Sequence, residues 1–268
     1  MASKLKTKYN EIFMQIRKDV VKIKLMGSKS RIAKYIVPII QKCIDDNNLE
    51  TYIESCVGGG NIIDKIKCKN RIGNDSNEYL IDFWNAMQNG LDLNSIKMDK
   101  DTYKDIRDNK EKYPKYMVAV AGILASYNSK WFAGYASPHY VSPTCTRYYY
   151  QESINNVLKQ MPNLMDVKFI CGDYKSIDVS NTMIYCDPPY ENTTGFKDKF
   201  NHSDYWEWVR KVSIDNFVLC SEYQAPDDFI EIWSGDVKIT LDNASRSKST
   251  EKLFTYKNGK YAEYIKVN

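Results

Sequence analysis

The sequence predicts an α/β fold built on a mostly parallel sheet. Strand-like apolar runs alternate with helix-like runs along most of the 268 residues. A glycine turn follows the first strand, as in βα units that bind ligands. Near the C-terminus, Asn258-Gly259 favours a tight antiparallel hairpin. The length suits one large α/β domain, or a core domain that carries an insert.

The predicted elements follow one another in a regular order. The first half is expected to contain a strand over 51–56, a turn at 58–60, a short helix over 61–66, a strand around 71–73 and helices around 102–112 and 115–126. The second half is expected to contain strands over 167–171, 183–186 and 217–220, a helix around 204–212, and two final strands over 252–256 and 261–266. The last two would flank the Asn258-Gly259 turn and end the sheet with antiparallel strands.

The alternation of strands and helices is interrupted between about residues 93 and 147. The pattern there is helical and then irregular through 127–140, a stretch of aromatic and small residues with a few cations. Such an insert beside a catalytic sheet suits recognition of a partner. The sequence therefore predicts a catalytic domain over 1–92 and 148–268 and a mainly helical recognition insert over 93–147.

The positive charge is unevenly spread, although the net charge is only +4. Lysines and arginines crowd the N-terminal 34 residues, where Glu11 and Asp19 are the acidic ones, and a second basic stretch runs from Arg246 to Lys260. This asymmetry suits a polyanionic partner, although solvated surface lysines are the plain alternative. The 21 tyrosines suit nucleic acid, because aromatic rings stack on bases.

Cysteine and histidine usage argues against disulfides and metal sites. The seven cysteines include no C-x-x-C pair, and there are two histidines. We expect reduced thiols, with Cys56, Cys171, Cys186 and Cys220 as small buried side chains. No apolar run approaches the roughly 20 residues that span a bilayer, and the N-terminus lacks an apolar signal region. The sequence therefore predicts a cytosolic protein without a membrane segment or a metal.

The segment Asp187-Pro188-Pro189-Tyr190 is the strongest functional signal. It follows the apolar run 183–186. Two prolines fix the backbone φ angles and remove two N–H donors, so the carbonyl groups are left as acceptors that can hold an amine. An aspartate at the carboxyl end of a strand lies where open α/β sheets bind ligands, and a tyrosine ring can cover a planar base. For the tetrapeptide alone, a strand that runs into a Pro-Pro turn is the alternative.

Three further segments suit a nucleoside cofactor. Glycines at Gly58, Gly59 and Gly60 let the backbone approach a ligand, and Asp75 follows the second strand, where carboxylates meet ribose hydroxyls. The Gly27-Ser28-Lys29 segment opens a helix with N–H groups and a cation for a carboxylate. Asp173 and Tyr174 end another strand, where an adenine ring would lie. Taken singly, each segment has an ordinary structural explanation.

In chain order, these segments resemble the Dam-type, or alpha-group, DNA adenine-N6 methyltransferases, including forms carried by bacteriophages. The shared pattern comprises Gly27 to Lys29, Gly58 to Gly60, Asp75, Tyr127-Asn128, Asp173-Tyr174, and Asp187 to Tyr190 followed by Thr194 and Phe196. Two features depart from the family. Glu54-Ser55-Cys56 stands where Glu-Pro-Phe is common, and the glycine-rich basic recognition hairpin is altered over 127–135. The resemblance therefore does not carry sequence specificity with it.

The resemblance implies a Rossmann-like seven-stranded sheet, S-adenosylmethionine as methyl donor and double-stranded DNA as partner. Asp187 and the Pro188 carbonyl would hold the adenine amine, Tyr190 would stack on the flipped base, and Phe196 would support its other side or only pack its loop. The implied cofactor residues are Gly27, Lys29, Gly58, Gly59, Gly60, Asp75, Asp173, Tyr174 and Asp187. The candidate DNA contacts are Asn128, Lys130, Arg147, Arg246 and Lys248.

Two other functions remain open at this point. Asp-Pro-Pro-Tyr also occurs in RNA methyltransferases that act on a base amine. A catalytically silent DNA-binding protein could retain the same fold, although it need not keep Asp187, Tyr190, Gly58 and Asp75. The expected setting is a bacterial or phage-infected cell, with or without a cognate restriction enzyme.

Overall fold

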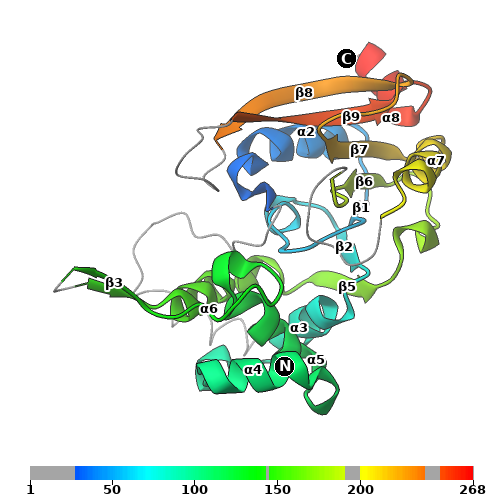
Figure 1. Ribbon diagram of the computed structural model, residues 1–268. Coiled ribbons are helices and arrows are strands. Elements are labelled where there is room, and N and C mark those ends of the chain that lie inside the picture. The colour runs from blue at the N-terminus through cyan, green and yellow to red at the C-terminus, as the bar shows by residue number, and fades with distance from the viewer. Residues whose placement is uncertain (1–27, 143–144, 191–199, 239–247, 268) are drawn as a thin grey trace. The chain divides into compact units, whose positions relative to one another are not determined.

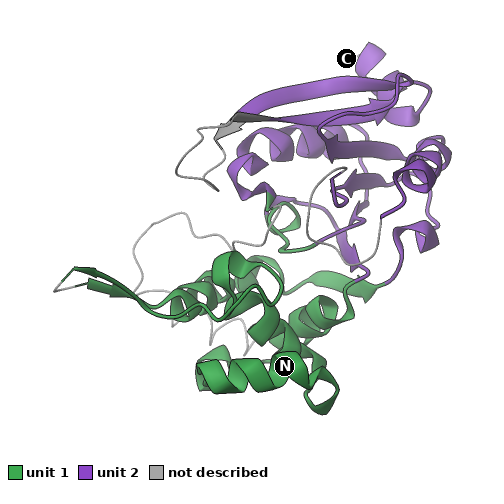
Figure 2. Ribbon diagram, viewed as in Figure 1, with its two compact units in different colours: residues 1–28, 58–64, 77–171 green, residues 29–57, 65–76, 172–268 purple. Residues whose placement is uncertain are grey.

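The computed structural model describes residues 28–142, 145–190, 200–238 and 248–267. The chain divides into two compact units, drawn in different colours in Figure 2. Unit 1 comprises residues 1–28, 58–64 and 77–171, and unit 2 comprises residues 29–57, 65–76 and 172–268. Residues 93–147, where the sequence predicts the insert, all fall within unit 1.

Unit 2 holds six strands of the main sheet, visible in the upper part of Figure 1. They are β1 (Thr51–Glu54), β2 (Asn70–Asp75), β6 (Met183–Cys186), β7 (Phe217–Glu222), β8 (Phe229–Lys238) and β9 (Lys248–Tyr256), in the order β2-β1-β6-β7-β9-β8. The first four pair in parallel, whereas β9 is antiparallel to both β7 and β8. The seventh strand, β5 (Val167–Cys171), belongs to unit 1. The predicted α/β class, with a mostly parallel sheet and an antiparallel C-terminal pair, is confirmed.

Three helices of unit 2 are α2 (Ala33–Asp46), α7 (His202–Val212) and α8 (Lys260–Val267). Helix α2 buries Ile36, Ile40 and Ile44, which are four residues apart and so lie on one apolar face of the helix. Asn201 caps the N-terminus of helix α7, where its side chain accepts a hydrogen bond from the Asp204 N–H. Its aromatic residues join a core cluster with β6 and β7. This packing fixes the carboxyl end of β6, where the candidate catalytic loop begins.

The predicted final hairpin is wrong in one part. Residues 261–266 lie in helix α8 and not in a strand, and the antiparallel pair is β8 with β9. Tyr261 and Ala262 are both buried, and two adjacent buried residues suit the face of a helix better than an edge strand with one solvated side. At the turn, the Lys260 N–H donates to the Ser213 carbonyl, and a Cβ on Gly259 would lie 2.8 Å from Ser213 Cβ. Because Gly259 has no side chain, the backbone can approach Ser213 closely. A type I′ hairpin does not form at this position.

Unit 1 is mainly helical. It contains α3 (Glu78–Gln88), α4 (Lys100–Asp108), α5 (Lys115–Ala119), which continues as a π-helix over Val120–Leu124, and α6 (Tyr149–Gln160). A small antiparallel pair is formed by β3 (His139–Ser142) and β4 (Cys145–Arg147). The helices expected around 102–112 and 115–126 are confirmed, with a break into a 3₁₀ helix at Lys110–Lys112. Helices α3 and α6 were not predicted.

The cysteines are free thiols, as expected. The predicted burial is confirmed for Cys186 and Cys220, whereas Cys56 is half-buried. Cys171 is exposed because it ends β5, beyond the buried residues Val167 and Phe169. Within the described ranges, no group of three or more histidine, cysteine or acidic side chains could hold a metal ion. In the same ranges, no helix has both the length and the apolar character that a membrane crossing requires.

Candidate active site

The candidate catalytic loop leaves the sheet at the carboxyl end of β6. All four residues of β6 are buried, and β6 lies between β1 and β7 in parallel pairing. Asp187 is the next residue, so its carboxylate lies at the edge where parallel strands of α/β proteins present their ligand sites. Pro188 is buried, and Asp187 and Tyr190 are half-buried. The loop is therefore anchored on a rigid core element.

Lys29 contacts the catalytic loop directly. It begins the 3₁₀ helix Lys29–Arg31, and its side chain is 7% exposed. Its Nζ lies 2.8 Å from Asp187 Oδ1 and 3.9 Å from Glu251 Oε2. The sequence suggested Lys29 for the cofactor carboxylate, but in the structure the ammonium faces two carboxylates of the protein. Lys29 thus orients Asp187.

Tyr190 is held from three directions. Its hydroxyl donates to Glu251 Oε2 at 2.8 Å, and its ring meets the Tyr223 ring edge-on with centroids 4.7 Å apart. Lys29 Nζ lies 4.2 Å from the Tyr190 ring centroid, within range for a cation–π contact. The sequence did not predict Glu251 and Tyr223 as site residues, because Glu251 lies in β9 and Tyr223 directly follows β7. Only the antiparallel pairing of β9 with β7 brings a residue 61 positions away to Tyr190.

Burial and charge oppose each other at Asp187. Burial raises the pKa of Asp187 to about 6; the Lys29 ammonium lowers it, and the Glu251 carboxylate adds a smaller increase. For Lys29, burial alone would lower the pKa, but Asp187 and Glu251 outweigh burial, so the pKa is raised. Lys29 therefore stays protonated at neutral pH while Asp187 is mainly ionised. The pair is charged under physiological conditions.

This balance predicts an acid limb in the pH profile of methyl transfer. An ionised carboxylate accepts hydrogen bonds from an amine much more strongly than a protonated carboxyl group does, so activity should be full well above the pKa of about 6 and fall as the pH drops through it. The measurement is kcat/KM for methyl transfer from about pH 5 to about pH 8, with folding followed by circular dichroism. A rate that stays constant across pH 6 in folded protein would contradict a role for ionised Asp187.

The glycine turn after β1 has the backbone that its sequence predicts. Gly58 and Gly60 have φ of +47° and +62°, the left-handed region that side chains disfavour. A Cβ on Gly58 would meet no atom of a described residue within 4 Å, so the requirement for glycine at this position is conformational. Trp84 Nε1 donates to the Gly58 carbonyl at 3.1 Å, and Gln160 Nε2 donates to the Gly59 and Gly60 carbonyls at 3.0 and 2.8 Å. The sequence reading missed both supporting side chains.

Asp75 ends β2, at the same carboxyl edge of the parallel strands as Asp187. Asp75 is half-buried, and its carbonyl accepts the Gly172 N–H at 3.1 Å. The neighbouring Asn74 is buried, and its amide donates to the Ser55 and Gly172 carbonyls, both at 3.0 Å. Asn74 therefore ties the ends of β1 and β2 to the segment that begins at Gly172. Its amide chemistry, two donors beside one acceptor, makes this cross-link possible.

Asp173 and Tyr174 both have structural contacts. Asp173 is exposed and caps the 3₁₀ helix Tyr174–Ser176 by accepting the Lys175 N–H at 2.8 Å. The Tyr174 ring packs edge-on against Trp208 and Tyr205, with centroids 5.0 and 5.6 Å away. An exposed carboxylate beside a fixed aromatic ring suits the adenine end of a cofactor.

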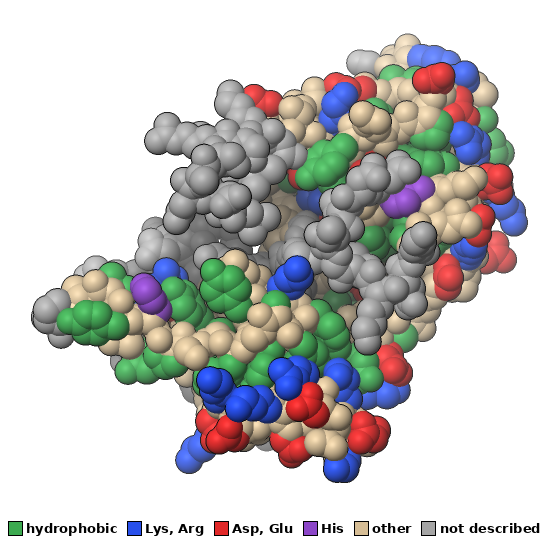
Figure 3. Space-filling view, in the orientation of Figure 1, with side chains coloured by type: hydrophobic (Ala, Val, Ile, Leu, Met, Phe, Trp, Pro, Cys, Tyr) green, Lys and Arg blue, Asp and Glu red, His purple; other side chains and the backbone are tan. Residues whose placement is uncertain are grey.

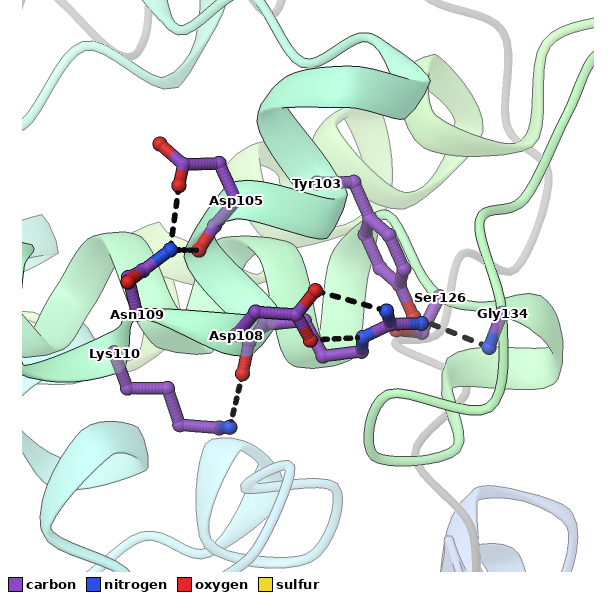
Figure 4. Close-up of polar contacts among 8 residues, drawn as sticks. Tyr103, Asp105, Asp108, Asn109, Lys110, Ser126 and Gly134 are labelled. Carbon is purple, nitrogen blue, oxygen red and sulfur yellow. Dashed lines mark hydrogen bonds and ion pairs between the residues drawn. The ribbon is translucent and has the colours of Figure 1, made fainter.

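In unit 1, the segment 127–135 has an unusual backbone. Asn128, Ser129 and Phe132 have positive φ, and Asn128 and Lys130 are exposed. Figure 4 shows how the segment is held: the Tyr103 hydroxyl lies 3.1 Å from Ser126 Oγ and accepts the Gly134 N–H at 3.1 Å. The exposed residues are therefore presented on a defined frame.

The other candidate DNA contacts have mixed outcomes. Arg147 is engaged with Glu152, Nε to Oε1 at 2.9 Å, and lies over the Tyr149 ring. Gly27, Phe196 and Arg246 lie outside the described residues, and Lys248 is described only as the first residue of β9. On the face drawn in Figure 3, cations over α4 and α5 are mixed with acidic side chains. This face of unit 1 therefore carries no patch of a single sign at those two helices.

Comparison with known proteins agrees with this geometry. Residues 26–207, more than half of the chain, match the family described as D12 class N6 adenine-specific DNA methyltransferase. The Type II methyltransferase M.MjaIII of Methanocaldococcus jannaschii is 26% identical over 203 residues, which cover 63% of this chain and 68% of that protein.

Two solved structures have a distant likeness. The PH1948 protein of Pyrococcus horikoshii gives a TM-score of 0.42 at 10% identity, over 94% of this chain and 98% of its own. The rRNA methyltransferase aviRa of Streptomyces viridochromogenes gives 0.41 at 8% identity, over 88% of this chain and 87% of its own. The family assignment rests on the sequence match instead. The chain belongs to the D12 class of N6 adenine-specific DNA methyltransferases, which use S-adenosylmethionine as methyl donor.

Proposed function

We propose that this enzyme methylates N6 of one adenine within a specific site of double-stranded DNA, and that the base is rotated out of the duplex first. The observation that carries the proposal is the end of β6, where the Asp187 carboxylate is oriented by Lys29 at 2.8 Å beside the fixed ring of Tyr190. This combination offers an acceptor for an amine and a flat surface for its base. Family membership supports adenine in DNA as the substrate.

Adenine N6 is a poor nucleophile because its lone pair is delocalised into the ring. The Asp187 carboxylate and the Pro188 carbonyl would accept the two amino hydrogens, which favours a pyramidal nitrogen with its lone pair facing the methyl group. S-adenosylmethionine supplies that methyl group as a sulfonium. The nitrogen lone pair would form the new N–C bond as the C–S bond breaks and its electron pair stays on sulfur, and the methylated nitrogen would then release one proton to water. Positioning of this kind can contribute roughly 7 to 11 kcal/mol.

The target base must leave the duplex because its amine is otherwise out of reach of the methyl donor. The amine of a stacked adenine cannot reach a methyl donor in a protein pocket, and unstacking costs a few kcal/mol. Stacking on Tyr190 would return about 1 to 3 kcal/mol. The edge-on contact with Tyr223 and the hydrogen bond to Glu251 fix the Tyr190 ring before the base arrives. Phe196 remains a proposed second support.

The cofactor and DNA assignments extend the same proposal. The glycine turn would approach the methionine part, Asp75 would bind the ribose hydroxyls, and Asp173 and Tyr174 would lie at the adenine ring. Gly27 remains a proposed cofactor-binding residue. The proposed DNA contacts are Asn128, Lys130, Arg147, Arg246 and Lys248. Release of Arg147 from Glu152 would be required before it bound a phosphate.

The direct test is substrate competition. The protein is incubated with methyl-labelled S-adenosylmethionine and either duplex DNA or RNA of matched sequence, and the nucleosides are separated after digestion. We expect label in N6-methyladenine from DNA. Label found only in RNA, or in a base other than adenine, would overturn the proposal. Sequencing DNA from a methylation-free host that expresses the protein would then identify the site.

Tyr190→Ala is expected to weaken catalysis more than DNA binding. Loss of stacking worth about 1 to 3 kcal/mol should lower kcat by about 5- to 150-fold. DNA affinity should change much less, because phosphate contacts dominate it. Single-turnover rates and fluorescence anisotropy measure the two quantities, with Tyr148→Ala on the exposed surface as control. Equal losses of rate and affinity would argue against stacking.

A further inference from the structure

Three side chains of unit 2 surround the Lys29 ammonium group: Asp187 and Tyr190 come from the loop after β6, and Glu251 comes from β9. Lys29 Nζ faces Asp187 Oδ1 at 2.8 Å, Glu251 Oε2 at 3.9 Å and the Tyr190 ring at 4.2 Å. The Tyr190 hydroxyl donates to the same Glu251 oxygen at 2.8 Å. Asp187 and Glu251 are 19% and 15% exposed, so water screens these interactions poorly. The four groups form one connected polar cluster.

Among the side chains that the structure describes, this cluster has one acidic group more than neutrality requires. Lys29 contributes one positive charge, and Asp187 and Glu251 contribute one negative charge each, so the net charge is −1 when all three are ionised. The tyrosines that face it do not change this sum, since burial raises the pKa of Tyr185 and Tyr190 well above their ordinary value. Burial of a second carboxylate beside one described ammonium is costly unless the carboxylate serves another group.

The proposed methyl transfer supplies a reason for that extra acid. As the reaction proceeds, positive charge moves from the sulfonium to the attacked nitrogen beside Asp187. A preorganised negative charge in a poorly hydrated site stabilises such a transition state. Lys29 alone would cancel the charge of Asp187. Glu251 restores it.

Glu251 also offers Lys29 a second partner, which matters because Lys29 and the target amine compete for Asp187. In the structure Lys29 contacts the very carboxylate that the target amine must reach. If an amino hydrogen takes a share of Asp187 Oδ1, the Lys29 ammonium needs another acceptor, because a buried unpaired ammonium is strongly unfavourable. Glu251 Oε2 lies 3.9 Å away, so a movement of about 1 Å would bring Lys29 to hydrogen-bonding distance.

We propose that Glu251 is a positioning residue for methyl transfer: it anchors Tyr190 through the phenol and serves as the second counter-ion of Lys29, which frees Asp187 for the target amine. This inference rests on the proposed function and deepens it. It assigns a role to β9, which is far from residues 187–190 in the sequence and is brought near them by its pairing with β7. Glu251 acts through Lys29, Tyr190 and Asp187, and touches neither reacting atom.

The test separates the two roles with two substitutions. Glu251→Gln keeps an acceptor for Tyr190 but removes the charge, and Tyr190→Phe keeps the ring but removes the hydrogen bond. We expect Glu251→Gln to lower kcat by about tenfold or more, with little change in cofactor affinity. Its acid limb should move to lower pH, because the Glu251 charge raises the pKa of Asp187. Tyr190→Phe should lower kcat less and leave the limb in place.

The pH comparison must consider every group that faces Asp187. Among the residues that the structure describes, these are Lys29, Glu251, Tyr185, Tyr190 and Cys56. Burial raises the pKa of the Cys56 thiol well above its ordinary value, so it stays neutral like the tyrosines. Glu251 and Lys29 are thus the charged neighbours among the described residues. A shift of the limb in Glu251→Gln reports on this charge and not on a loss of packing.

The matched control is Glu231→Gln on the adjacent strand β8. The Glu231 side chain is 39% exposed and pairs with Lys252 of β9 at 2.9 Å, so the substitution should leave kcat and the pH limb unchanged. If Glu251→Gln does not fold, Glu251→Asp replaces it: the charge stays, so the limb should stay, while the shorter side chain should lower kcat.

The outcomes are distinguishable from failure of the proposed function. If wild-type protein transfers no methyl group to duplex DNA, the proposed function fails first. If wild type methylates DNA while Glu251→Gln keeps the wild-type kcat and acid limb, the role of Glu251 is wrong. An unchanged kcat in Glu251→Asp would likewise contradict anchoring of Tyr190.

Discussion

Asp187→Ala is expected to abolish methyl transfer, with a loss in kcat of at least about 10³-fold, while cofactor binding stays measurable. The carboxylate is the proposed acceptor for the target amine, and losses of about 10² to 10³ are typical when one preorganised polar group is removed from an active site. Positioning adds to this, because Lys29 at 2.8 Å would lose its principal partner. The measurement is single-turnover transfer of labelled methyl to duplex DNA, beside calorimetric binding of S-adenosylmethionine.

Two comparisons isolate the chemical role of Asp187. Asp187→Asn keeps the size of the side chain but removes the charge, so it should also be nearly inactive. It tests whether the charge or the shape matters, because its fold should be less disturbed than that of the alanine variant. Thermal unfolding of both variants controls for stability. Near-normal turnover in either variant would show that the proposed mechanism is wrong.

Trp84→Ala is expected to have the largest effect on stability. Trp84 is fully buried, stacks on Phe169 with centroids 5.6 Å apart and packs against Phe83. Removal of a large buried aromatic side chain costs about 3 to 5 kcal/mol in free energy of unfolding. Urea denaturation measures this loss, with Tyr148→Ala on the surface as a control that should change stability by less than about 1 kcal/mol.

Trp84→Phe tests the link from this core residue to the glycine turn. The ring remains, but the indole N–H that binds the Gly58 carbonyl at 3.1 Å is lost. One hydrogen bond contributes about 0.5 to 1.5 kcal/mol, so stability should fall modestly. If the turn holds the cofactor as proposed, the KM for S-adenosylmethionine should rise while kcat changes little. A change in stability without any change in KM would separate Trp84 from the cofactor site.

Much of the fold could be predicted because its signals are local. The strands at 167–171 and 183–186 are short apolar runs, and the structure reproduces both bounds. The end of the chain was misread because Tyr261 to Lys266 fits both an alternating and a helical pattern. The choice depends on whether Tyr261 and Ala262 are both buried, which only the packing of α8 beside β7 and β9 determines. Helices α3 and α6 were missed although each has an amphipathic pattern.

The candidate site divides in the same way. The sequence pointed to Asp187, Tyr190 and the glycine turn, since prolines and glycines restrict the backbone at the residues themselves. The partners of these residues had no comparable signal. Glu251 stands in an ordinary strand, and Trp84 and Gln160 face the core from helices, where such residues usually only pack.

The sequence by itself determined the class of fold, the turn after β1, the acceptor loop after β6 and the family of the enzyme. These depend on backbone restrictions and on the order of motifs, which are properties of neighbouring residues. The tertiary structure alone decided that Lys29 faces Asp187, that Glu251 shares Lys29 and Tyr190, and that the pKa of Asp187 rises to about 6. The reason is physical: charge pairing and burial act through space between segments that only strand pairing brings together.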